Sequence, residues 1–296
     1  MRNLVDRPGP LRLSLFLAVG IAAVSCGAVL VRLAAAPALV VATYRVSWAT
    51  CLLAPLMISG PARELRTSTW QDWRNLALSG IALALHFALW IASLSYTSVA
   101  SSVLLVDTTP FFIGFASQWF LRRPCGRDFW VGLGVAFLGC IVVFHGDWAR
   151  SSASLRGNML ALGGAIAVAV YLMIGSTARR RLSLLAYVWP VYGTAALALA
   201  TTAALAGVSL RRLPARTHLF MFLVGLVPQC IGHTTYNWSL RWLQPGLVAL
   251  IGLAEPVGAS LLAYFVLNEG LTVEKGLGGC LILVGIYLAT ARKMGK

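Results

Sequence analysis

The sequence predicts an all-α integral membrane protein with ten transmembrane helices in two inverted repeats of five. Of its 296 residues, 59% are apolar and only 11% are charged, and the mean hydropathy is +0.80. A soluble domain carries roughly 25% charged residues, so this composition indicates a polytopic membrane protein. Two apolar runs that carry mid-membrane prolines, Pro110 and Pro256, lie 146 residues apart, close to half the chain.

Ten apolar runs follow one another along the chain, each about as long as the hydrocarbon core of a bilayer requires. They cover residues 11–31, 37–59, 76–95, 99–121, 127–145, 157–178, 183–206, 218–240, 246–267 and 273–291. The first run also resembles a lipoprotein signal that ends at Cys26. It continues to Val31, however, which is longer than a cleaved signal would be, so we expect a span.

The basic residues lie in short clusters between the runs, which is typical of topology signals and not of a surface that binds nucleic acid. An even number of spans places both termini on one side. Sixteen of the 24 Lys and Arg residues lie on that side, seven lie on the other, and Arg45 lies within a span. The positive-inside rule therefore predicts a multi-pass protein of the cell (inner) membrane with both termini in the cytoplasm.

A short hydrophilic linker joins five spans to five. Since five is odd, the second half must enter the membrane from the opposite side, and such inverted repeats are the usual construction of secondary transporters. Laying residues 93–144 over 239–290 pairs Pro110 with Pro256, Gly132 with Gly278 and Gly139 with Gly285. The predicted boundaries are residues 10–145 for the first repeat, 146–155 for the linker and 156–291 for the second repeat.

The ninth run places one acid, Glu255, beside Pro256 in mid-membrane. A lone acid in lipid costs ~2.5–3.5 kcal/mol, so it must face other protein or a water-filled cavity. Proline also frees a carbonyl one turn back, which needs a partner too. The fourth run repeats this arrangement with Asp107 three residues before Pro110. We therefore expect a helix break at each proline.

Glu255 is the predicted coupling residue. A carboxyl group withdrawn from water can exchange protons near neutral pH when its cavity opens to either side, as proton-linked antiport requires. Gly252 and Ala259 share its helix face and leave room for substrate or water. The alternative is that Glu255 only fixes helix packing.

Two further runs carry polar faces. His86 and Trp90 are four residues apart in the third run; Gln229, His233 and Asn237 recur at the same spacing in the eighth, with Tyr236 adjoining. Residues with this spacing share one side of a helix. Polar faces in lipid look inward, so we expect them to line a cavity with the fourth and ninth spans. The alternative is that they hydrogen-bond neighbouring helices.

Arg45 and Asp107 each lie eight residues into their spans, counted from the same side of the membrane. Both would therefore sit ~12 Å deep at 1.5 Å per residue. One interpretation is a structural ion pair that neutralises two buried charges. The other is that Arg45 binds a substrate carboxylate while Asp107 binds an amine.

Residues 86–121 and 246–288 resemble the two repeats of EamA transporters in the drug/metabolite transporter superfamily. The second copy is the closer match, because it has Glu255-Pro256 in mid-helix, Asn268-Glu269 at the span end and a glycine-rich last helix. In the first copy Thr109 stands in the place of Glu255, and Arg123 in that of Glu269. The resemblance implies a ten-helix secondary transporter, commonly an exporter of amino acids or related metabolites, with a cavity formed by the first four helices of each repeat.

The sequence thus predicts a secondary transporter that exports small metabolites, such as amino acids or amines, by alternating access coupled to protons. The alternatives are a passive channel, a non-transporting receptor and an intramembrane enzyme. Catalysis is the least favoured, because the chain has no H-E-x-x-H, no G-x-S-x-G, no P-loop and no paired aspartates. We expect a small-molecule substrate and the lipid bilayer as partners, and neither a cofactor nor a metal site, since the six cysteines lack ligand spacing.

Overall fold

The computed structural model describes residues 8–97, 99–119, 125–148, 155–211, 213–267 and 272–294. These residues form helices and short connections, and no strand occurs among them. The predicted all-α class is therefore confirmed. The all-α class follows from the lipid surroundings, because a helix satisfies its backbone N–H and C=O groups internally where no water is present. Asn268 and Glu269, which contribute to the family resemblance, and Arg123, which departs from it, lie outside the described residues.

The helical elements divide between the two halves of the chain. The first half contains α1 (Pro10–Ser25), α2 (Gly27–Ala34), α3 (Ala38–Leu53), the 3-10 helix η1 (Ala54–Ser59), α4 (Pro61–Arg66), α5 (Trp70–Ser93), α6 (Val99–Val106), α7 (Thr109–Trp119) and α8 (Arg127–Trp148). The second half contains α9 (Leu155–Ala178), α10 (Leu184–Leu205), α11 (Ala215–Val224), the π-helix η2 (Gly225–His233), α12 (Thr234–Ser239), α13 (Pro245–Gly252), α14 (Glu255–Leu267) and α15 (Val273–Met294).

Eight helical stretches among the described residues are long and apolar enough to cross a membrane. They are Pro10–Ala34, Ala38–Ile58, Trp70–Ser93, Leu155–Ala178, Leu184–Leu205, Ala215–Ser239, Pro245–Val266 and Val273–Ala291. The fourth and fifth predicted spans hold α6, α7 and α8, which are helical but are not among these eight. A multi-pass membrane protein is thus supported, and the number of ten spans stays a prediction.

Three of the expected spans are broken in the middle. The breaks fall at Cys26 between α1 and α2, at Asp107–Thr108 between α6 and α7, and at Leu253–Ala254 between α13 and α14. Pro110 and Pro256 are the second residues of α7 and α14, where a missing N–H costs no intrahelical bond. Pro228 lies inside η2, and a proline within a helix removes one such bond, which suits the wider π turn.

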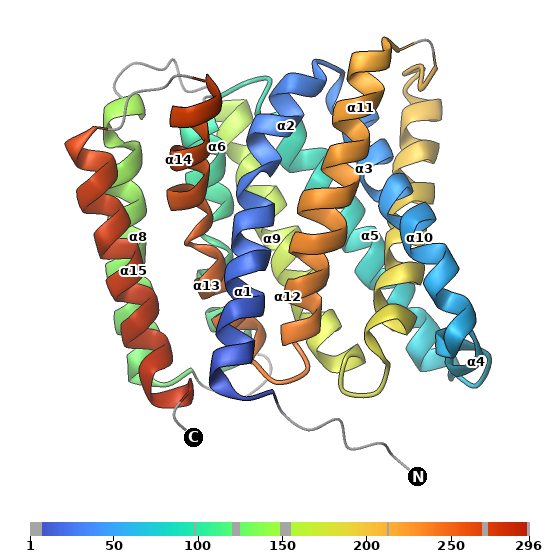
Figure 1. Cartoon of the computed structure of the whole chain (residues 1–296), viewed down its shortest axis with the longest axis horizontal. Coiled ribbons are helices and arrows are strands. Elements are labelled where there is room, and N and C mark those ends of the chain that lie inside the picture. Colours follow the sequence, from blue (N-terminus) through green and yellow to red (C-terminus); the bar gives the residue numbers. More distant parts are fainter. Residues whose placement is uncertain are drawn as a thin grey trace.

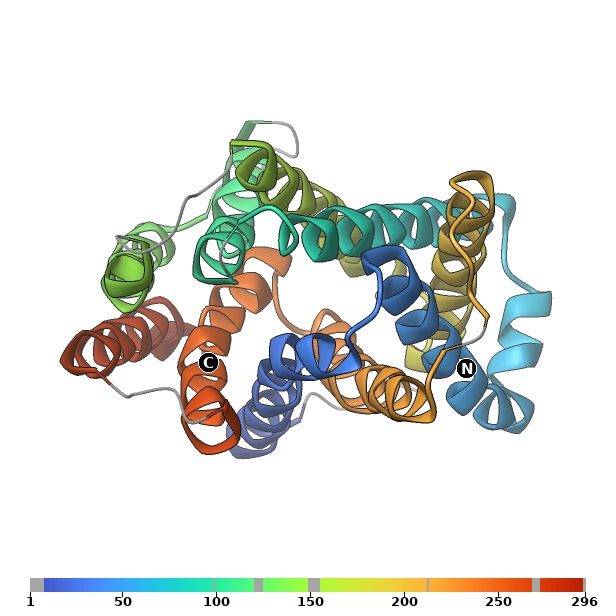
Figure 2. The same ribbon diagram turned by 90° about the horizontal axis from the view of Figure 1, so that it is seen from above.

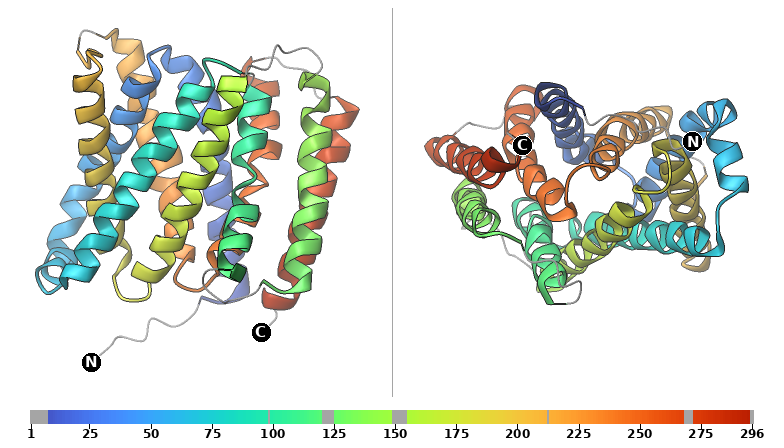
Figure 3. Two further views of the ribbon diagram at one scale, coloured as in Figure 1. Left: turned by 180° about the vertical axis from the view of Figure 1, so that it is seen from behind. Right: turned by 90° about the horizontal axis from the view of Figure 1, so that it is seen from below.

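The long helices run side by side between two faces of the molecule (Figures 1 and 3). Helix α1 begins and α15 ends at the same face, at the bottom of Figure 1. Helix α4 and the connections α9–α10 and α12–α13 lie there too. We call this end the terminal face. Seen from above, α8 and α15 form one end of the bundle, and α4 and α10 lie toward the other (Figure 2).

Contacts between the two halves come in matched sets. Helix α5 packs on α9 while η2 packs on α1, and α7 packs on α9 while α14 packs on α1. Helix α8 packs on α15, and α3 packs on α10. The counterparts are α1 and α9, α3 and α10, α5 and η2, α7 and α14, and α8 and α15. When each element is exchanged for its counterpart, every one of these pairs becomes another pair or itself.

Glycines bring α8 and α15 into backbone contact. A Cβ added at Gly132 would lie 2.5 Å from the carbonyl oxygen of Gly285, and one at Gly139 would lie 2.6 Å from that of Gly278. No side chain fits at these distances, so only glycine permits this approach. Gly134, on the same helix, is different, because a Cβ there would have nothing within 4 Å.

We predict that Gly132→Ala lowers the thermal unfolding midpoint of the purified protein by about 2–8 °C. The added methyl group meets backbone that cannot move aside, and overpacking of this kind costs ~1–3 kcal/mol. Gly134→Ala is the matched control, since it gives the same gain in helix propensity without a clash, and it should not lower the midpoint. Equal midpoints for the two variants would contradict the close contact.

Candidate functional site

A cavity of about 50 Å³ lies where the broken helices meet. It has room for a few water molecules. Its lining comes from both halves of the chain and consists of Val24, Gly27, Arg45, His86, Trp90, Val103, Val106, Asp107, His233 and Glu255. Six of these were predicted site residues: Arg45, His86, Trp90, Asp107, His233 and Glu255. The four apolar or small lining residues come from α1, α2 and α6, and no polar pattern in the sequence pointed to them.

The helix breaks are secured by hydroxyl groups. Oγ of Ser25, the last residue of α1, lies 2.8 Å from the backbone oxygen of Ile21 and 3.2 Å from that of Glu255, and its one hydrogen serves these two acceptors. Thr109, the first residue of α7, donates from Oγ1 to the oxygens of Val106 at 2.7 Å and Ala165 at 3.3 Å. The carbonyl of Val106 is freed at its break, because Pro110 four residues later has no N–H, and in lipid such a group needs a partner. Helices α7 and α14 therefore begin beside the cavity, with the positive ends of their dipoles there.

Arg45 is the arginine that lines the cavity, and it is only 2% exposed. Its Nε donates to Oε1 of Gln229 at 2.7 Å. Its guanidinium carbon lies 4.1 Å from the centre of the Phe87 ring and 5.9 Å from that of Trp90. Among the described residues no ion pair joins Arg45 to Asp107, so the amide of Gln229 takes the place that the structural ion-pair interpretation gave to Asp107.

The two acids of the cavity have different surroundings. Asp107 lies in the connection between α6 and α7, and its Oδ2 is buried without a hydrogen-bond partner in the described structure. Glu255 is the first residue of α14 and interacts electrostatically with both Asp107 and Arg45. The hydroxyl of Tyr236, also a predicted site residue, is buried without a partner among the described residues and lies within the electrostatic influence of both acids. The site therefore has unused hydrogen-bonding capacity beside its acids.

Aromatic rings form one wall of the cavity. His86 lies parallel to Trp90, with ring centres 6.0 Å apart, and its Nδ1 is 3.0 Å from the carbonyl oxygen of Gly164. A carbonyl only accepts, so Nδ1 carries the hydrogen and Nε2 of the neutral ring is the acceptor. The ring of His233 lies 6.5 Å from His86 and 5.4 Å from Phe87. These rings offer a flat apolar surface next to the charged groups.

Gln229, His233 and Asn237, which were predicted to share one face of the eighth span, have three different surroundings. Gln229 bonds Arg45, His233 lines the cavity, and Asn237 turns toward α9 and α10. An α-helix would keep residues four apart on one side, but Gly225–His233 is π-helical and turns more slowly. Asn237 Nδ2 donates to the hydroxyls of Tyr171 at 2.5 Å and Tyr192 at 3.3 Å. The spacing in the sequence gave no sign of these tyrosine partners.

A family model settles the relationship of the chain to known proteins. The model of the EamA-like transporter family matches residues 12–145 and 155–291. The chain belongs to the EamA-like transporter family. Every residue that lines the cavity lies within the matched EamA segments.

Relatives of this EamA protein are also named as transporters. An uncharacterized transporter of Bacillus subtilis is 23% identical over 231 residues, which cover 78% of this chain and 77% of that protein. An uncharacterized transporter of Archaeoglobus fulgidus is 25% identical over 260 residues, covering 86% and 88%. A thiamine-repressible mitochondrial transport protein of Saccharomyces cerevisiae is 31% identical over 129 residues, covering 40% and 35%. These three names share the description of a transporter or transport protein.

A solved crystal structure has the same fold. It aligns with a TM-score of 0.80 at 17% identity and covers 95% of this chain and 97% of its own. At this identity the likeness concerns the fold alone, so the function of the EamA site must be argued from its residues.

We predict that Gln229→Met lowers the thermal unfolding midpoint by about 5–10 °C. Methionine keeps the length of the side chain but removes the acceptor of Arg45 Nε, and hydrogen bonds to buried charges are worth ~1.5–3 kcal/mol. Gln244→Met is the control, because Gln244 is exposed and no hydrogen bond from its side chain is among the described contacts. A midpoint as high as that of the control would show that Arg45 does not depend on Gln229.

Proposed function

We propose that this EamA protein is a secondary transporter that exports small polar metabolites through the cavity by alternating access. The observation that carries the proposal is the meeting of one arginine, two acids and two histidines at a cavity between broken helices. Ionisable groups inside a membrane are costly and mark substrate or ion pathways. Binding at mid-depth between discontinuous helices is the usual arrangement in secondary transporters.

Two inverted repeats support alternation between two states. The glycine contacts between α8 and α15 have the symmetry of the repeat. The overlay pairs Gly132 with Gly278 and Gly139 with Gly285, so the contact of Gly132 with Gly285 corresponds to that of Gly278 with Gly139. The matched helix pairs have this symmetry too. We infer repeats at residues 10–145 and 156–291, each with five spans. Two halves related in this way can adopt each other's conformation, which opens the cavity to the opposite side.

The orientation follows from charge. The terminal face carries α4, with Arg63 and Arg66, and the connection that holds Arg179, Arg180 and Arg181. Basic residues concentrate on the cytoplasmic side of bilayers, so we place the terminal face in the cytoplasm of a cell whose inner membrane the chain spans. Export then means movement from the terminal face to the opposite face.

We propose a substrate with an amino group. Nε of Arg45 is engaged by Gln229 and its guanidinium lies over Phe87, whereas Oδ2 of Asp107 is buried without a partner among the described residues. A carboxylate oxygen left unpaired gains most from a charged donor, and an ammonium group is one. The remaining guanidinium N–H groups suit a carboxylate, so amino acids and amines are the substrate classes that fit. The cavity must widen from its present volume to take them.

Exchange measured in liposomes tests both transport and proton coupling. Purified protein is reconstituted in liposomes loaded with pooled metabolites, with and without a pH gradient, and mass spectrometry identifies what crosses. We predict that a small set of amino acids or amines exchanges, and that Glu255→Gln removes the response to the gradient because the side chain no longer binds a proton. Glu274→Gln is the control, since Glu274 is likewise in the first turn of a helix but does not line the cavity.

Other outcomes of this measurement separate the alternatives. Saturable exchange that ignores both pH and Glu255→Gln would keep the transporter and overturn the proton coupling. Flux that does not saturate and needs no counter-substrate would indicate a passive channel. No exchange of any metabolite would overturn the proposed function.

Asp107→Asn should discriminate among the substrates that this screen identifies. We predict at least a tenfold loss of transport for an amine-bearing substrate, and a smaller loss for an analogue without the amino group, because asparagine cannot supply the charge. Arg45→Lys should give the opposite preference, since it loses the bidentate fork for a carboxylate. Equal losses for both compounds in both variants would count against the assigned roles.

A further inference from the structure

A buried layer of polar groups lies between the cavity and the terminal face. Its members are Ser79, Tyr171, Arg179, Tyr187, Tyr192 and Asn237, each at most 2% exposed. Ser79 is seven residues closer to the terminal face than His86 on α5, and Tyr171 is seven residues closer than Gly164 on α9. Seven residues of helix span about 10 Å, so the layer lies roughly two turns beyond the cavity.

Most of the hydrogen bonds of this layer tie α12 to the α9–α10 hairpin. Asn237 on α12 donates to Tyr171 on α9 at 2.5 Å and to Tyr192 on α10 at 3.3 Å. The hydroxyl of Tyr192 also lies 3.1 Å from Oγ1 of Thr234 on α12. Arg179, just after α9, donates from Nε to the backbone oxygen of Asn237 at 3.0 Å. The ends of these helices are therefore held together at several points.

Asn237 and Thr234 also have hydrogen-bond acceptors within their own span, which they keep if the bonds to the α9–α10 hairpin break. Nδ2 of Asn237, which has two hydrogens for its three acceptors, also lies 2.8 Å from the oxygen of His233. Oγ1 of Thr234 donates to the backbone oxygen of Gln229 at 3.2 Å, and both contacts lie within the same span. Separation of α12 from the hairpin thus leaves one N–H of the Asn237 amide and the hydroxyl of Thr234 bonded. On the α12 side the layer can therefore open at a lower cost than a network in which every donor depends on the hairpin.

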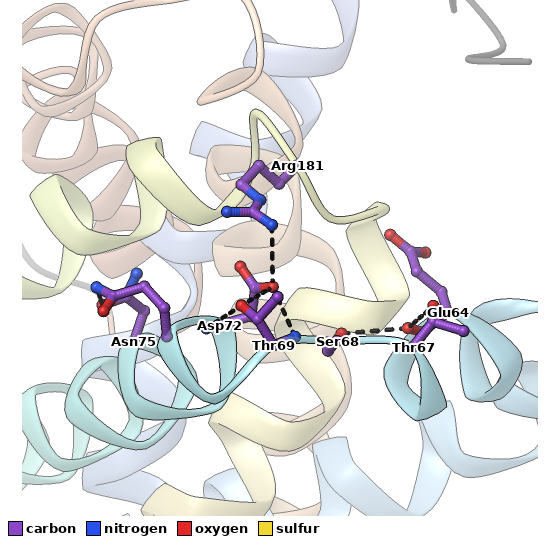
Figure 4. A network of polar contacts seen from close by, with 8 residues as sticks. Glu64, Thr67, Ser68, Thr69, Asp72, Asn75 and Arg181 are labelled. Atoms are coloured by element: carbon purple, nitrogen blue, oxygen red, sulfur yellow. Dashed lines mark hydrogen bonds and ion pairs between the residues drawn. The ribbon is translucent and has the colours of Figure 1, made fainter.

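A second tier of contacts lies at the terminal face itself. Arg181, in the α9–α10 connection, forms an ion pair with Asp72 at the start of α5 (Figure 4), with 3.4 Å between the guanidinium and the carboxylate. Glu64 on α4 accepts from the backbone N–H of Ser183 at 2.8 Å. These contacts hold the hairpin to α4 and α5 and do not involve α12. The seam that can open is therefore the one between α12 and the hairpin.

We propose that the Asn237–Tyr171–Tyr192 cluster is the gate that closes the cavity toward the terminal face, and that α12 parts from the α9–α10 hairpin when the cavity opens to that side. The inference rests on the proposed alternating-access function. It assigns a role to buried tyrosines that take no part in the lining of the cavity. Asn237, a predicted substrate ligand, is on this basis a gate residue.

Three Tyr→Phe changes separate a gate from ordinary packing. Tyr171→Phe with Tyr192→Phe removes the hydroxyls that face α12 and keeps the volume of each ring. Tyr187→Phe is the matched control, because its hydroxyl lies 2.6 Å from Oγ of Ser79 on α5 and makes no described bond to α12. Thermal unfolding of all variants establishes that they fold.

The readout is access to the cavity from each side. Val106, which lines the cavity, is changed to cysteine in a chain whose six native cysteines are replaced by alanine. A membrane-impermeant maleimide is then applied to vesicles of either orientation. We expect Tyr171→Phe/Tyr192→Phe to raise labelling from the terminal face about three- to twentyfold relative to labelling from the other face, and Tyr187→Phe to leave the ratio unchanged.

The outcomes distinguish the gate from the proposed function. An unchanged ratio in the double variant, or an equal rise in Tyr187→Phe, would overturn the gate even where liposomes show transport. A rise confined to the double variant would support the gate even if the metabolite screen found no substrate, because labelling does not depend on flux.

Discussion

The absence of water around the helices is the constraint on which the rest of this structure depends. Lipid offers no hydrogen-bond partner, so every group freed by a helix break or carried on a polar side chain must be satisfied by the protein or by a cavity. Groups from neighbouring spans meet much of this demand: the hydroxyl of Ser25 reaches the backbone at Glu255, that of Thr109 reaches the backbone at Val106 and Ala165, and Gln229 bonds Arg45. Of the five buried side-chain groups without a hydrogen-bond partner among the described residues, two, Oδ2 of Asp107 and the hydroxyl of Tyr236, belong to the site and its surroundings.

The two halves share a scaffold but not a chemistry. Thr109 and Glu255 occupy equivalent positions, each at the first residue of a half-helix followed by proline. Thr109 directs its hydroxyl to backbone oxygens and closes its break, whereas the side chain of Glu255 lines the cavity. Asp107 has the apolar Leu253 as its counterpart. Repetition thus explains how the bundle is built, and the departures from repetition supply the charges of the site.

Sequence patterns predicted the helical class, the breaks at the prolines and most of the cavity. They could do so because a charge or a proline in an apolar run has few permitted positions in lipid. They missed the partner of Arg45 because equal depth in the membrane pointed to Asp107. They also placed Gln229 and Asn237 on one helix face, which the π-helical segment around Pro228 separates. The tyrosine partners were missed for another reason. A tyrosine in an apolar run has no period of its own, and only packing of α9 and α10 against α12 reveals it.

The π-helical segment gives the proposed gate a physical link to the cavity. Gln229, within η2, accepts a hydrogen bond from Arg45 at its side-chain oxygen and one from Thr234 at its backbone oxygen. The hydroxyl of Thr234 in turn contacts that of Tyr192. A substrate that drew Arg45 away from Gln229 would release one end of this chain of bonds, while the other end is the gate. A π turn is one residue longer than an α turn, so η2 can tighten or widen by small shifts. Binding and opening would then bias one two-state element, which is the physical requirement for coupling between two sites.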